Sequence, residues 1–73
     1  MVHHVYNVVR HPDGWAVEHM GKLLEVHASH EAAEAHVVGL RKLTQSGGHD
    51  AEVVIQDETG AVESDRVYKA VKR

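Results

Sequence analysis

One segment of the chain repeats its core-facing side chains at helical spacing. Between Ser29 and Gln45, steps of three and four residues place one stripe on a helix: Ala33, Val37, Leu40 and Thr44, with Leu43 alongside. Ser29 is a suitable N-cap, because its hydroxyl can accept a hydrogen bond from the first turn. Gly47 and Gly48 predict the helix end, since glycine readily takes the left-handed conformation. We therefore expect one amphipathic helix over this segment.

The residues before this helix predict a β-hairpin. Val5–Val9 and Trp15–Met20 are rich in β-branched and aromatic side chains, and His11-Pro12-Asp13-Gly14 between them is a strong turn signal. If these four residues form the loop, the two strands pair in one register: Arg10 with Trp15, Val8 with Val17 and Tyr6 with His19. A loop of another length would change the partners of Trp15.

Three further strands complete the prediction: Leu23–Val26, Glu52–Gln56 and Ala61–Ser64. The fourth strand is apolar enough to be central, and the fifth is a weaker edge strand that residues 67–73 either extend or leave frayed. Residues 1–73 then form a single small α+β domain. Its order is β-β-β-α-β-β, with one helix packed across one face of an antiparallel sheet.

The predicted sheet has one covered and one uncovered face. Alternation along the strands points one set towards the helix: Tyr6, Val8, Trp15, Val17, Val53 and Ile55. The other face shows a second apolar set, interrupted by polar residues: Val5, Val9, Ala16, Met20 and Val54. A chain of 8.1 kDa exposes about 4,500 Å² when folded and has only a thin core. Since monomers rarely leave a large apolar patch in water, we expect a homodimer.

The motifs also carry a family resemblance. They run through the first hairpin, the helix and the fourth strand: Tyr6-x-Val8-Val9, Gly14-Trp15-x-Val17, Gly21, Glu31-Ala32, Ala35, Val53-Val54-Ile55 and Gly60. Over residues 5–68 this pattern resembles domain of unknown function 2188, a family of small bacterial proteins. The resemblance implies a fold, but no activity, cofactor or site residue.

Composition disfavours nucleic-acid binding and excludes several other functions. Eight Lys and Arg against 11 Asp and Glu give a net charge of −3, whereas nucleic-acid binders carry a basic surplus. The absence of cysteine removes thiol catalysis, thiolate zinc sites and redox switching. The sequence has no apolar run long enough to span a membrane and no signal-peptide pattern, so we expect a cytoplasmic protein.

Histidine is the compositional oddity, with eight in 73 residues. His27 and His30 flank the helix start, and Glu34 follows one turn later, so these three side chains could meet one metal ion. The HExxH spacing of a helical zinc site is lacking. We therefore expect no metal site, and we expect His27 and His30 to face solvent and to bind metal only adventitiously. His36 borders the apolar stripe, and we expect it to be a partly buried histidine with a hydrogen-bond partner rather than a metal ligand.

The remaining candidates point away from catalysis. Trp15 could be a stacking platform for a ligand, but a core without phenylalanine needs it as filler. The sequence has neither a nucleophile elbow nor a phosphate-binding loop, so we expect no enzyme and no cofactor. Two functional classes remain. The first is a non-enzymatic interaction module that self-associates or docks on an unidentified protein. The second is a nucleic-acid-binding module that uses the sheet face or the basic tail of Lys69, Lys72 and Arg73.

Overall fold

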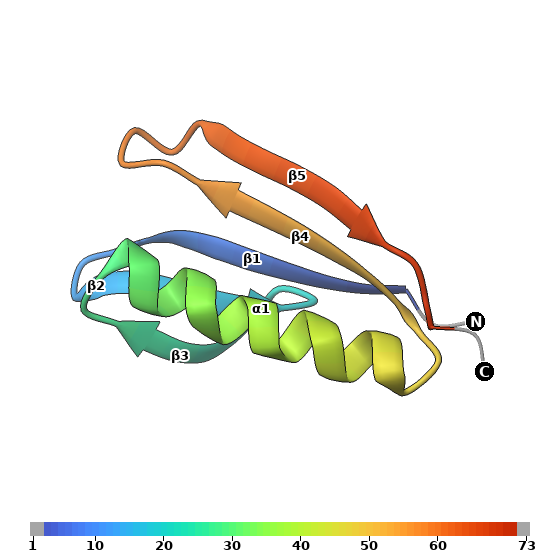
Figure 1. The fold of residues 1–73 in the computed structure, drawn as a ribbon. Coiled ribbons are helices and arrows are strands. Elements are labelled where there is room, and N and C mark those ends of the chain that lie inside the picture. The colour runs from blue at the N-terminus through green and yellow to red at the C-terminus, as the bar shows by residue number, and fades with distance from the viewer. Residues whose placement is uncertain (1–2, 72–73) are drawn as a thin grey trace.

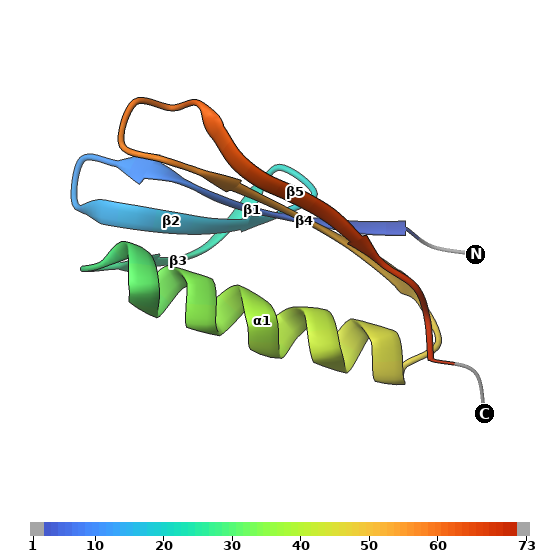
Figure 2. The ribbon, with the colours of Figure 1, turned by 45° about the horizontal axis from the view of Figure 1, so that its top comes forward.

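The computed structural model describes residues 3–71, which form five strands and one helix (Figure 1). The elements are, in chain order, β1 (His3–His11), β2 (Gly14–His19), β3 (Lys22–His27), α1 (His30–Ser46), β4 (Asp50–Gln56) and β5 (Val62–Tyr68). Helix α1 lies against one face of the sheet (Figure 2). The predicted α+β class and order of elements are confirmed. Lys72 and Arg73 of the predicted basic tail lie outside the described residues.

The sheet is mixed, and this corrects the expectation that it is antiparallel throughout. Its strand order is β3-β2-β1-β4-β5, and within it β1 and β4 run parallel. The cause is the connection between β3 and β4. Helix α1 carries the chain back along the sheet, so β4 starts at the same end as β3 and β1. As predicted, β4 has a neighbour on each side.

The register predicted for the first hairpin is confirmed. Tyr6 pairs with His19, Val8 with Val17, and Arg10 with Trp15. Gly14 opens β2 with a φ of 139°, and a Cβ atom there would lie 2.1 Å from the carbonyl oxygen of His27. Only glycine therefore allows β2 to begin this close to the end of β3.

Helix α1 is positioned by its cap and by its buried stripe. The Ser29 hydroxyl accepts from the Ala32 amide at 3.1 Å, as predicted. Ala33 and Val37 are fully buried, and Thr44 lies 2.7 Å from the hydroxyl of Tyr6. Thr44 donates its own proton to the Leu40 carbonyl at 2.9 Å, so Tyr6 is the donor to Thr44.

The helix ends at the predicted glycines, and one detail of the predicted stripe is wrong. Gly47 ends α1 with a φ of −78°, and the left-handed conformation is taken one residue later by Gly48, at 87°. Leu43 does not belong to the buried stripe, because its side chain points away from the sheet and is 72% exposed.

The core lies between α1 and the covered face of the sheet. It consists of the residues predicted for that face together with small residues from α1 and β4: Tyr6, Val8, Trp15, Val17, Ala33, Val37, Ala51, Val53 and Ile55. Trp15 is 6% exposed, which confirms its role as core filler. The exposed surface of 4670 Å² is close to the size-based expectation. In the described residues, no helix has both the length and the apolar character that crossing a membrane requires.

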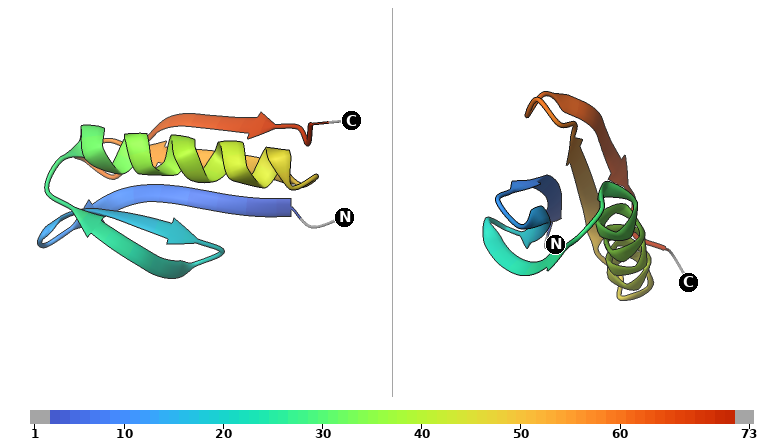
Figure 3. Two further views of the ribbon diagram at one scale, coloured as in Figure 1. Left: turned by 60° about the horizontal axis from the view of Figure 1, so that its bottom comes forward. Right: turned by 90° about the vertical axis from the view of Figure 1, so that its left-hand side faces the viewer.

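Strand β5 is longer than predicted and lies at the edge of the sheet. Helix α1 packs against β1 to β4, and in Figure 3 (left) it lies over β4 while β5 follows the outer edge. The end of β5 is fastened to the helix. The Arg41 guanidinium stacks on the Tyr68 ring at 4.1 Å, and the Gln45 side chain donates to the Lys69 carbonyl at 2.9 Å. The other end of β5 diverges from α1, which leaves a cleft.

Candidate functional site

The three predicted metal candidates do not meet. His30 and Glu34 lie together in the first turns of α1, with His30 Nδ1 3.5 Å from a Glu34 carboxylate oxygen. His27, at the end of β3, contacts His36 instead. Two clusters result. We call His30, Glu34 and Glu63 the cleft cluster, and Glu25, His27 and His36 the strand–helix cluster.

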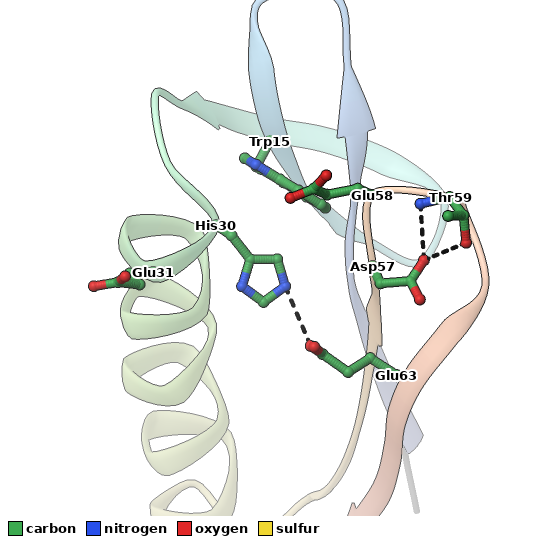
Figure 4. A pocket seen from close by; sticks show the side chains of 7 residues that line it. All are labelled: Trp15, His30, Glu31, Asp57, Glu58, Thr59 and Glu63. Atoms are coloured by element: carbon green, nitrogen blue, oxygen red, sulfur yellow. Dashed lines mark hydrogen bonds and ion pairs between the residues drawn. The ribbon is translucent and has the colours of Figure 1, made fainter.

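The cleft cluster borders a hollow of about 450 Å³ between the start of α1 and the β4–β5 turn (Figure 4). The floor and the helix side of this cleft are formed by Trp15, His30 and Glu31. The turn and the start of β5 contribute Asp57, Glu58, Thr59 and Glu63. With four carboxylates among its lining residues, the cleft suits a cationic group better than an anion.

His30 is held between an aromatic ring and two carboxylates. Its ring meets Trp15 edge-on, with the centroids 4.6 Å apart. Its Nε2 atom lies 3.3 Å from Glu63 and points across the cleft, but it is buried without a well-directed hydrogen bond (Figure 4). Each ring nitrogen therefore faces a different carboxylate.

Asp57 shapes the cleft rather than supplying a reactive carboxylate. One of its oxygens accepts from the Thr59 hydroxyl at 2.6 Å and from the Thr59 amide at 2.9 Å. These hydrogen bonds, with that of the Thr59 side chain strongest, lower the pKa of Asp57. The Thr59 hydroxyl donates to Asp57, and the lowered pKa of that carboxylate makes it a weak base for activating a nucleophile.

The strand–helix cluster is compact. His27 Nε2 lies 2.9 Å from His36 Nδ1 and 3.6 Å from a Glu25 carboxylate oxygen. The two imidazole rings are edge-to-face, with centroids 5.0 Å apart. His36 is half-buried and hydrogen-bonded, as the sequence predicts. The expectation that His27 and His30 face solvent is wrong, because their side chains are only 17% and 25% exposed.

A third group of histidines lies under the far end of α1, and sequence analysis missed it. His4 Nδ1 is 2.7 Å from His19 Nε2, and the rings of His4, His19 and Tyr6 stack along the covered face of the sheet. His49 meets His4 edge-on at 5.4 Å. Burial lowers the pKa of His4, and the neighbouring charges of His19, His49 and His3 lower it further. The predicted pairing of Tyr6 with His19 was the available signal, since His4 alternates with Tyr6 along β1.

Comparison with known proteins does not identify a family for this chain. No family model, no curated protein and no solved structure matches the chain. The resemblance to domain of unknown function 2188 therefore stays a prediction.

Proposed function

We propose that the chain is a non-enzymatic interaction module that self-associates through the open face of its sheet, the face that α1 does not cover. The observation that carries the proposal is the exposure of apolar side chains there. On β5, Val62 is 60% exposed and Val67 is 49% exposed, and the register places both on the open face. Large apolar side chains left in water on a monomer mark an interaction surface.

All five strands contribute to this face. Strand alternation, with the observed pairings, gives its apolar members: Val5, Val9, Ala16, Leu23, Val26, Val54, Val62 and Val67. Along the sheet, Val5 and Val67 lie on either side of Glu52. Ala16, between Val9 and Val26, is almost fully buried. The face is therefore apolar but interrupted, which suits a modest interface.

Pairing through the sheet edges is less favourable. A two-fold axis centred on β5 would place Asp65 opposite its own copy, or Arg66 opposite its own copy, and like charges directly opposed are destabilising. On the other edge, β3 contains a bulge in which Leu24 has no partner in β2. Bulges distort an edge and hinder strand addition. These features favour contact through the face.

The remaining surfaces support a binding role without catalysis. The cleft holds no serine or cysteine, and its threonine hydroxyl is committed to Asp57. Nucleic-acid binding, the alternative from the sequence, gains no support from the cleft, which is acidic. Trp15 is buried and cannot offer its face to a base.

Light scattering after size exclusion tests self-association. At about 100 µM, we expect the full chain to give close to twice its mass of 8.1 kDa, because dimers are favoured by mass action. Val62→Lys should restore the monomer mass, since it places a charge on the exposed part of the open face. Val9→Lys, at the centre of the same face, should do the same.

Leu43→Lys is the matched control. Leu43 is also an exposed apolar residue, but it lies on α1, away from the open face. This variant should keep the dimer mass. A folded wild-type monomer at this concentration, or equal loss of the dimer in Leu43→Lys, would overturn the proposal.

A further inference from the structure

The strand–helix cluster has the donors of a transition-metal site. Two imidazole nitrogens and one carboxylate oxygen, from Glu25, His27 and His36, all lie within 4.8 Å of one another. Imidazole and carboxylate are common zinc ligands, and two histidines with one glutamate form a recurrent three-ligand set. The cluster joins two elements, because Glu25 and His27 come from β3 and His36 comes from α1.

The distances fit one ion with little movement. For ligand bonds of about 2.0–2.1 Å in a tetrahedron, neighbouring ligand atoms lie about 3.3–3.4 Å apart. The nitrogens of His27 and His36 are now 2.9 Å apart, and His27 and Glu25 are separated by 3.6 Å. The first of these gaps has to widen and the second to narrow by a few tenths of an ångström, while the third gap, between Glu25 and His36, is at most 4.8 Å. Glu25 is 59% exposed, so its side chain is free to adjust.

We propose that Glu25, His27 and His36 bind a divalent transition-metal ion, with Zn²⁺ as the best fit. His27 supplies Nε2, His36 supplies Nδ1, and Glu25 supplies a carboxylate oxygen. The fourth position is left for water or another small ligand. Both rings must carry their proton on the nitrogen that faces away from the ion, so acid weakens binding by protonating the imidazoles.

The surrounding fold holds two of the ligands in place. Gly14 lies against the carbonyl of His27, and a side chain there would displace the end of β3. His36 follows the buried Ala33 by one turn and precedes Val37, so core packing sets its direction. A bound ion would tie the edge strand β3 to α1 and stabilise the folded state.

The cleft cluster is the weaker alternative. There the two carboxylates lie against opposite nitrogens of one imidazole, with Glu34 at Nδ1 and Glu63 at Nε2 of His30. An ion can bond to only one of these nitrogens. An ion in the cleft cluster would therefore bind the imidazole and one carboxylate where they now lie, and the second carboxylate would have to move to reach it. Two imidazoles meeting at facing nitrogens give the strand–helix cluster the advantage.

Calorimetric titration of the tag-free full chain with Zn²⁺ tests the site. We expect binding near one ion per chain and a rise in melting temperature when Zn²⁺ is added. Glu25→Gln and His36→Gln should each weaken Zn²⁺ binding at least about tenfold. Loss of a residue that only orients a metal ligand already weakens metal binding by about that factor. Glu25→Gln changes an exposed side chain, so its effect cannot come from unfolding. Bound Co²⁺ should give a visible absorption spectrum that both variants lose.

His30→Gln is the matched control, since it removes one imidazole and leaves the strand–helix cluster intact. It should bind Zn²⁺ as the wild type does. The Val62→Lys variant should also keep its affinity, which separates this site from the proposed self-association. Zn²⁺ binding that survives Glu25→Gln and His36→Gln, that is lost in His30→Gln, or that is undetectable at micromolar protein would overturn the proposal.

Discussion

Trp15 is the residue on which the core depends most. It is the largest side chain in the core cluster, and it connects the first hairpin to the helix start through its contact with His30. On its other side, the Arg10 guanidinium lies 5.3 Å from the ring. Apart from Tyr6 and Ile55, the rest of the core cluster consists of valine and alanine, so removal of the indole would leave a cavity.

We therefore expect Trp15→Ala to cost about 3–5 kcal/mol, which is comparable to the whole stability of a domain this small. Circular dichroism and urea titration should show a largely unfolded chain. Wild-type tryptophan emission should be blue-shifted and poorly quenched by iodide. Trp15→Phe should remain folded with reduced stability. A stable Trp15→Ala variant would contradict the assignment of this side chain to the core.

At the residue scale, the sequence predicted what local chemistry determines. The turn residues Pro12 and Asp13 fix the hairpin loop, and the register that follows from it places Tyr6 opposite His19 as expected. The orientation of His27 could not be predicted in this way. It depends on the close approach of β2 and β3 at Gly14 and on a helix residue nine positions away.

At the scale of elements, the histidine group under the far end of α1 shows how packing creates acid sensitivity. His4 comes from β1, His19 from β2, and His49 from the loop before β4. These rings face one another and Tyr6, so a proton on one opposes a proton on the next. The helical pattern predicted a partly buried His36, whereas the burial of His4 follows from contacts between elements that no single segment shows.

The lowered pKa of His4 gives the direction of a pH effect. A histidine whose folded pKa lies below the unfolded value stabilises the fold above about pH 6.5, and this contribution is lost as the pH falls towards the folded pKa. We expect urea titrations to show stability declining from neutral pH into this window. His4→Phe should flatten the decline, because phenylalanine stacks without binding a proton. His11→Phe, at the hairpin end of β1, should leave the slope unchanged, and an equal slope in His4→Phe would exclude His4 as the source.

The arrangement of elements was predicted only in part. Hydrophobic patterning identified every element of the described chain and the strand residues on both faces of the first hairpin. Met20, predicted on the open face, lies instead in the turn after β2. The parallel pairing of β1 with β4 was missed, because it follows from the direction in which α1 returns the chain rather than from any strand pattern. Tyr68 extends β5 and stacks on Arg41, a contact that depends on the helix and the edge strand meeting at one end.

At the scale of the whole molecule, charge divides unevenly between the two faces of the sheet. The register places three strand carboxylates, Glu18, Glu52 and Asp65, on the open face. Two others, Glu25 and Glu63, lie on the helix side in the two histidine clusters. The basic strand residues Arg10, Lys22 and Arg66 lie on the helix side. Two copies that meet through their open faces therefore bring acidic groups together, whereas a partner rich in lysine and arginine would neutralise them.

The effect of salt concentration on binding therefore distinguishes a homodimer from a complex with a basic partner. The screening length falls from about 10 Å at about 0.1 M salt to about 3 Å at about 1 M, which weakens repulsion between the two faces. We expect sedimentation equilibrium to give a smaller dimer dissociation constant at the higher salt concentration. Asp65→Asn should dimerise more tightly at low salt and respond less to added salt, because it removes one of the repelling charges. If salt instead tightened the dimer by salting out apolar surface, Asp65→Asn and the wild type would respond equally to added salt. A dimer that weakens with added salt would contradict contact through the acidic open face.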